Sequence, residues 1–148
     1  MNGLYVLVAG LNGMIMVLMG AYGAHGLAGV DLLYHATFQT GWQIHAVHSV
    51  FLAAVALYAR HNHWLHGAFW LGLVGTMFFC IPLYGPAFDW WSNGGFVTPV
   101  GGFFLLAAWF SMALAGISRM KSRAYRISDR DLTRRYYETM AHSRPREK

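Results

Sequence analysis

The chain has 148 residues, of which 56% are hydrophobic and 11% are charged, and its formal net charge is +5. A soluble domain carries roughly 25% charged residues, so this composition excludes an ordinary soluble protein and indicates a single membrane domain. The basic excess does not indicate nucleic-acid binding, because it lies in one terminal segment without a binding module.

Charged residues divide the first 118 positions into four apolar stretches. The three charges in this part are Asp31, Arg60 and Asp89, and the stretches between them are 1–30, 32–59, 61–88 and 90–118. Each can hold a membrane-spanning helix, which needs about 20 mostly apolar residues. We therefore predict an all-α fold, an integral membrane four-helix bundle (1–118) followed by a basic, partly helical cytoplasmic tail (119–148).

The four helices are expected at about 4–24, 40–59, 65–84 and 98–118. The first has no basic residue before it and is longer than the apolar region of a signal peptide, so we expect it to be retained. Residues 25–39 are half polar and fit a short interfacial helix. Pro82 is expected to kink or end the third helix. Thr98 is predicted to cap the fourth, with Pro99 at its first position.

The basic residues predict the orientation. Four spans place both ends of the chain on one side of the membrane, together with the turn that holds Arg60. All eleven Lys and Arg residues then lie on that side, while Asp31 and Asp89 lie on the other. The positive-inside rule predicts that both termini are cytoplasmic.

The tail has the pattern of a short basic amphipathic helix. Ser128 and Asp131 resemble a capping box, and Leu132, Tyr136 and Met140 then recur every four residues. Such a segment lies on a membrane surface or docks on a partner subunit, and the alternative is a frayed, solvated tail. The predicted contacts with anionic lipid headgroups or an acidic partner are Arg119, Lys121, Arg123, Arg126, Arg130, Arg134 and Arg135.

Histidines are the main candidates for chemistry. Of the four on the predicted outer side, His25 and His35 lie near the first connection, and His45 and His48 share one face of the second helix. Three interpretations stay open. A structural hydrogen-bond network would also include Tyr34, Thr40 and Gln43. A haem or metal site would use His25 with His48, or all four histidines. A proton or small-solute path is the third.

Other catalytic machinery is not apparent. His61, His63 and His66 belong to the turn beside Arg60 and are expected to face headgroups. Cys80 lies in an apolar run and is expected to be a small buried residue. The chain has no phosphate-binding glycine loop, no zinc-protease motif and no nucleophile elbow. We therefore expect neither an enzyme nor a bound cofactor.

Several short motifs resemble the YgdD-like family (domain of unknown function 423), small bacterial inner-membrane proteins related to the animal transmembrane protein 256. Gly20-Ala-Tyr-Gly-Ala-His-Gly-Leu27, with Gly23, His25 and Gly26, resembles its G-A-x-G-A-H-G-L signature. Thr40-Gly41 with His48 is similar to T-G-x-x-Y-x-x-x-H, and Leu83-Tyr84 to S-L-Y. Thr98-Pro-Val-Gly-Gly102, with Pro99 and Gly101, is similar to T-P-x-G-G, and Trp109 follows it.

The resemblance implies a four-helix protein of the bacterial inner membrane with no established activity. Ile44 and His45 depart from the Tyr and Gln common in the family, and the tail after residue 118 is longer than the family pattern. Such extensions often dock a small subunit onto a larger assembly. The leading hypothesis is therefore a structural or accessory subunit of a membrane protein complex. The alternative is a histidine-lined redox or transport component.

Overall fold

The computed structural model describes residues 3–59, 62–88, 90 and 95–143, with the backbone but not the side chains of 124, 127, 128 and 139–143. The predicted features at Arg60, His61, Asp89 and Trp91 lie outside the described residues. The described elements are helices α1 (Gly3–His25), α2 (Leu32–Tyr58), α3 (His63–Tyr84) and α4 (Val97–Ser143), with a short 3-10 turn η2 (Gly85–Phe88) after α3.

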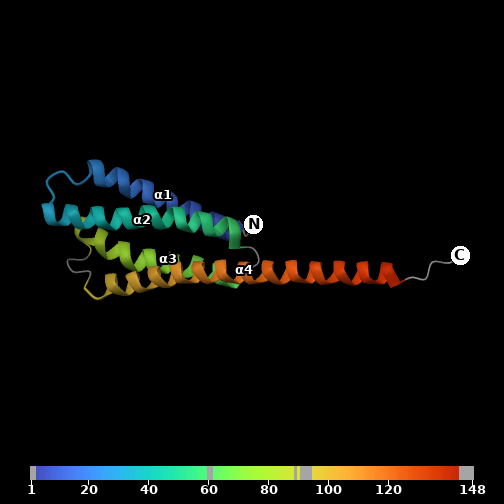
Figure 1. Ribbon diagram of the computed structural model, residues 1–148. Helices are drawn as coiled ribbons and strands as arrows, with labels where there is room; N and C mark the ends of the chain where they lie inside the picture. Colours follow the sequence, from blue (N-terminus) through green and yellow to red (C-terminus); the bar gives the residue numbers. More distant parts are fainter. Residues whose placement is uncertain (1–2, 60–61, 89, 91–94, 144–148) are drawn as a thin grey trace.

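The predicted four-helix membrane bundle is confirmed. Each helix contains a segment long and apolar enough to cross a membrane, with mean hydropathies of 2.0, 1.2, 1.6 and 1.9 in chain order. The helices run antiparallel, so that the N-terminus, the connection from α2 to α3 and the far end of α4 all lie toward one end (Figure 1). We call this the basic end, because the Lys and Arg residues of α4 lie there.

Two helices begin earlier than the apolar pattern predicted, because polar residues cap them. Asp31 accepts a hydrogen bond from the Leu33 backbone N–H through its side chain at 2.8 Å, and α2 starts at Leu32 rather than at position 40. The predicted interfacial segment is therefore the first two turns of α2. Asn62 caps α3 in the same way, by accepting from the Trp64 N–H at 3.0 Å.

The fourth helix differs most from its prediction. It was expected to end near Ser118, with a new helix capped at Ser128, but α4 continues unbroken to Ser143. The physical reason is that residues 117–143 contain neither Gly nor Pro, so nothing in this stretch interrupts the helix. At its other end α4 starts at Val97, so Thr98 lies inside the first turn instead of capping it.

The helices pack in chain order, α1 on α2, α2 on α3 and α3 on α4. Two apolar clusters fill the bundle. The cluster nearer the basic end centres on Phe51, Leu52 and Phe69. The other comprises Leu27, Phe38, Cys80 and Tyr84. Buried polar side chains lie between these clusters, and they form the candidate site.

Candidate functional site

His45 and His48 are buried near the middle of α2, with 4% and 6% of their surface exposed. The sequence placed them in the outer half of the membrane, but the bundle holds them between its two apolar clusters. A buried polar group in such surroundings is costly unless it is hydrogen-bonded. The partners of both rings therefore decide what they can do.

His45 joins three helices. Its Nδ1 lies 3.1 Å from the Tyr84 hydroxyl of α3, and its Nε2 lies 3.3 Å from Oδ1 of Asn12 on α1. The Asn12 amide nitrogen donates to Ser49 Oγ of α2 at 2.8 Å. Because the Asn12 oxygen only accepts, the ring donates from Nε2 and accepts from the Tyr84 O–H at Nδ1. A neutral imidazole satisfies the whole chain of bonds.

His48 is bonded through both ring nitrogens as well. The indole Nε1–H of Trp109 on α4 donates to His48 Nε2 at 3.2 Å, and His48 Nδ1 lies 2.8 Å from the Ile44 carbonyl oxygen. An indole can only donate and a carbonyl can only accept, so the proton of His48 sits on Nδ1. Its free lone pair is already used by Trp109. A metal could reach it only by breaking this bond between helices.

The other two of the four histidines predicted on the outer side lie away from His45 and His48. His25 is exposed as the last residue of α1, and His35 is half-buried in the first turn of α2. About 20 Å of helix separates His35 from His48 along α2, at 1.5 Å per residue. Along α1, Gly23 packs against Phe38 whereas Asn12 bonds His45, so His25 lies toward the start of α2 and is not brought to His48 for a shared haem. Among the described residues, no group of three His, Cys, Asp or Glu side chains is placed to hold a metal ion.

The hydrogen-bond network differs from the one expected in its other members. Tyr34, Thr40 and Gln43 are exposed, and the Thr40 hydroxyl bonds the Ala36 carbonyl of its own helix. The partners are instead Asn12, Tyr84 and Trp109, which come from the other three helices. Their only sequence signal is that each is a polar-tipped residue inside an apolar span, a type that often faces a bundle interior.

A second polar contact lies toward the basic end. His66 Nδ1 lies 2.8 Å from the Tyr5 hydroxyl, which also accepts from Trp70 Nε1 at 3.0 Å. The sequence placed His63 and His66 among the headgroups. His63 is exposed, but His66 is half-buried against α1. This contact ties α1 to α3.

The glycines of the two family-like motifs have unequal packing. A Cβ at Gly23 would lie 2.8 Å from the Phe38 ring, and one at Gly26 would lie 2.6 Å from the Tyr22 ring. At Gly101 it would meet the α3 backbone, 2.7 Å from the carbonyl carbon of Phe78, whereas at Gly102 the nearest atoms are 3.8 Å away. Gly101 is thus the point where α4 and α3 approach most closely within this motif. The hydroxyl of Thr98 is buried without a partner among the described residues, and Pro99 is exposed.

Cys80 is buried, as predicted. It is 2% exposed, and its Sγ lies 3.3 Å from the Gly41 carbonyl oxygen. Beside it, an apolar cavity of about 340 Å³ lies between α1 and α3, with Asn12, His45 and Tyr84 in its wall. Asn12 and Tyr84 are both hydrogen-bonded to His45, so the cavity suits a hydrocarbon chain better than a polar ligand.

The seven basic residues predicted to contact lipid or a partner all lie on the part of α4 beyond residue 118, and all are exposed: Arg119, Lys121, Arg123, Arg126, Arg130, Arg134 and Arg135. Arg119 Nη2 donates to the Tyr58 carbonyl oxygen at 3.2 Å. Farther along, Arg134 pairs with Glu138 at 2.9 Å. Some of the basic side chains, such as Arg119, therefore lie near the bundle, whereas others, such as Arg134, lie well beyond it along α4.

Comparisons with known proteins place the bundle in a family. A family model described as a protein of unknown function (DUF423) matches residues 19–102. The UPF0382 inner membrane protein YgdD of Escherichia coli K12 is 33% identical over 121 residues, covering 80% of this chain and 92% of that protein. A UPF0382 membrane protein of Haemophilus influenzae is 31% identical, covering 76% and 93%. YwdK of Bacillus subtilis is 30% identical, covering 76% and 95%. No solved structure matches.

Proposed function

Because the chain belongs to the DUF423 family of membrane proteins of unknown function, we propose its role from its own structure: a structural or accessory subunit of a larger membrane protein complex. The histidine network supports a structural role. Three of the four ring nitrogens of His45 and His48 are bonded to other helices, and the fourth, His48 Nδ1, is bonded to the Ile44 carbonyl oxygen of α2. These bonds stabilise the bundle and leave no free lone pair for chemistry.

The observation that carries the proposal is the length of α4 beyond the bundle. Residues 119–143 extend the helix by about 37 Å, and Figure 1 shows this part running straight on with no other helix beside it. It exposes large apolar side chains, with Tyr125 77%, Leu132 64% and Tyr136 59% exposed. These three recur at spacings of seven and four, so they form one stripe along the helix. We call them the apolar stripe.

The direction of α4 favours a protein partner over the membrane surface for this stripe. A hydrocarbon core about 30 Å thick accommodates about 20 helical residues, which reach from Val97 to about Ser118. The headgroup layer adds about 5–8 Å. At 1.5 Å per residue, Arg134 lies about 24 Å past the core, clear of the lipid. A helix lying on the membrane would need a bend after residue 118, and α4 continues without one.

The charge of the extension indicates the kind of surface that it meets. Residues 119–143 carry Asp129, Asp131 and Glu138 against the seven basic residues, so their net charge is positive. A positive helix with an apolar stripe fits an acidic groove on the partner's membrane-proximal domain. The same positive charge supports cytoplasmic termini through the positive-inside rule.

Co-purification of stripe variants tests the proposal. The full chain is purified from its native membrane in mild detergent and resolved on native gels, where we expect a species much larger than the free chain. Replacing Leu132 and Tyr136 with alanine should release the chain from it. Tyr137→Ala is the matched control, because Tyr137 is 68% exposed but lies about 100° around the helix.

Two results would argue against the accessory role. One is migration of the unaltered chain as a free monomer or small homo-oligomer. The other is equal loss of the large species in the stripe variant and in Tyr137→Ala, since that would indicate general damage to the helix.

The orientation has a separate test. Cysteine replaces Leu132 in a Cys80→Ala background, and intact spheroplasts are treated with a membrane-impermeant maleimide. We expect labelling only after lysis. Labelling of intact spheroplasts would place the extension on the outer side and reverse the proposed topology.

A further inference from the structure

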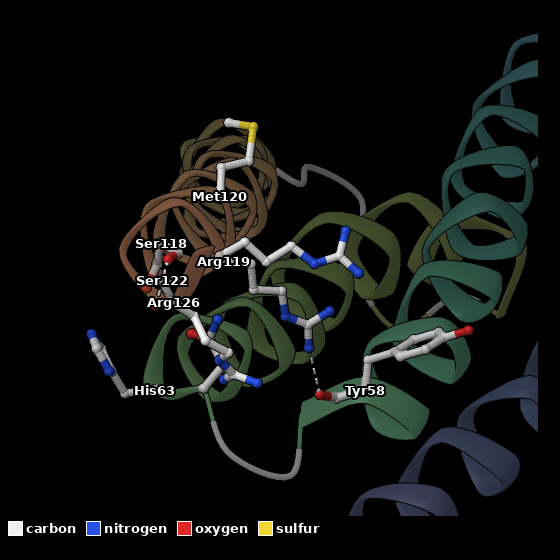
Figure 2. Close-up of a pocket in the computed structure, with 9 residues that line it drawn as sticks. Tyr58, His63, Ser118, Arg119, Met120, Ser122 and Arg126 are labelled. Atoms are coloured by element: carbon white, nitrogen blue, oxygen red, sulfur yellow. Dashed lines mark hydrogen bonds between the residues drawn. The ribbon is translucent and has the colours of Figure 1, made fainter. Parts of the chain in front are cut away.

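A basic pocket lies where α4 leaves the bundle. It has a volume of about 600 Å³ and is lined by Arg119, Arg123 and Arg126 of α4, Tyr58 at the end of α2, and Asn62 and His63 at the start of α3. Figure 2 shows Arg119 and Arg126 reaching from α4 toward Tyr58 and the first turn of α3. The three arginines share one helix face because they are spaced by four and three residues. We call this pocket the basic notch.

The notch holds cations without anions. Among the described residues, no carboxylate pairs with Arg119, Arg123 or Arg126, and Arg119 uses one donor on the Tyr58 carbonyl. Asp129, the nearest acidic residue along α4, does not line the notch; it lines a neighbouring hollow with Lys121 and Arg126 and forms no ion pair with Arg126 in the described part of the chain. Three guanidinium groups on one face repel one another. An anion that accepts several N–H bonds relieves this repulsion, and phosphate matches the planar fork of arginine.

The position of the notch indicates where the phosphate comes from. It lies at the end of α2 and the start of α3, where the apolar part of α4 gives way to charged residues. Arg119 and Arg123 lie within about 8 Å of the core boundary near Ser118, which is the depth of lipid headgroups, and Arg126 lies about one turn farther out. A basic pocket between helices at this depth is a typical site for an anionic headgroup.

An apolar groove continues from the notch into the membrane-spanning part. It has a volume of about 210 Å³, and Tyr58 and Arg119 line both the groove and the notch. Its other walls include Val55 of α2, Leu65 of α3 and Gly116 of α4. A free phosphate ion would gain no favourable contact from the apolar walls of this groove. A phospholipid fits both parts, with its phosphate in the notch and an acyl chain in the groove.

We propose that the basic notch and its groove form a specific site for one anionic phospholipid, held by its phosphate group. Arg123 and Arg126 supply the charge that is not used within the protein, and Arg119 marks the boundary between headgroup and chain. This site does not depend on the accessory role, because it is built entirely from the chain's own helices.

Lipid titration of the purified full chain, followed by native mass spectrometry, tests the site. The probes are phosphatidylglycerol, phosphatidylcholine with the same acyl chains, and inorganic phosphate. Arg123→Gln with Arg126→Gln should weaken phosphatidylglycerol binding roughly thirtyfold, from about fivefold per basic residue. The control is Lys121→Gln with Arg130→Gln, which removes the same charge outside the notch and should leave binding nearly unchanged.

A second pair of variants tests the acyl-chain part. A Cβ at Gly116 meets nothing within 4 Å, and Gly116 lines the groove, so Gly116→Leu places a larger side chain in the groove from a position with room for its first atom. It should weaken phosphatidylglycerol binding and leave inorganic phosphate unaffected. Gly10→Leu is the control, because Gly10 is equally open but lines another groove.

Three results would overturn the proposal. Equal binding of phosphatidylglycerol and phosphatidylcholine would show that there is no anionic site. Equal losses in the two charge variants would show attraction to the whole tail rather than to the notch. Unchanged phosphatidylglycerol binding in Gly116→Leu, with inorganic phosphate competing for the same site, would identify the occupant as a soluble anion.

Discussion

Replacing Gly101 with alanine should destabilise the bundle, whereas the same change at the adjacent Gly102 should not. A Cβ at Gly101 would lie 2.7 Å from the Phe78 carbonyl carbon and would also overlap the Phe79 backbone nitrogen. These are backbone atoms of α3, so no side chain can rotate to make room and the two helices must move apart. At Gly102 the nearest atoms belong to the Phe79 ring at 3.8 Å, an ordinary contact.

The comparison isolates the cost of the clash. Alanine is favoured over glycine within a helix by about 1 kcal/mol, and this gain applies to both positions. Overpacking costs about 1–3 kcal/mol, and at Gly101 it comes in addition. The difference in stability between the variants is therefore about 1–3 kcal/mol. For a chain of this size, that corresponds to about 2–12 °C in the melting temperature.

Thermal unfolding in mild detergent measures this difference. The chain contains six tryptophans, so intrinsic fluorescence follows the transition. Gly102→Ala should melt at or above the temperature of the unaltered chain, and Gly101→Ala below it. Equal melting temperatures for the two variants would refute the close approach of α3 and α4 at Gly101.

Three further experiments, two substitutions and one labelling reaction, test other contacts. Trp109→Phe removes the donor to His48 and should cost about 0.5–2 kcal/mol in thermal unfolding, and replacing His48 in this background should cost less than replacing it in the unaltered chain; equal costs would show that the two side chains do not interact. Cys80, 2% exposed, should resist a membrane-permeant maleimide in the folded chain and react in dodecyl sulfate; rapid labelling while folded would contradict its burial. Asp31→Ala removes the cap of α2 and should destabilise it by about 1 kcal/mol, visible as faster hydrogen exchange near Leu33, whereas unchanged exchange would argue against the cap.

The number and order of the membrane helices are determined by the sequence alone. In lipid each backbone N–H and C=O group must be hydrogen-bonded within the protein, and a helix is the structure in which a single long apolar stretch satisfies all of these groups. The three charges at positions 31, 60 and 89 separate these stretches, and the basic residues after 118 mark one end. The helix limits were less predictable. Hydropathy follows the lipid boundary, while the true ends depend on the caps at Asp31 and Asn62.

The faces that meet inside the bundle were decided only by the tertiary structure. The membrane-spanning parts of all four helices are apolar around most of their surface, so hydrophobic periodicity does not show which side is buried. His45 could therefore be singled out from the sequence, but its partners Asn12 and Tyr84 could not. Nothing in the sequence distinguishes the packing of Gly101 from that of Gly102, because they are adjacent glycines of the same motif. A rotation of about 100° per residue places one against the α3 backbone and leaves the other with space.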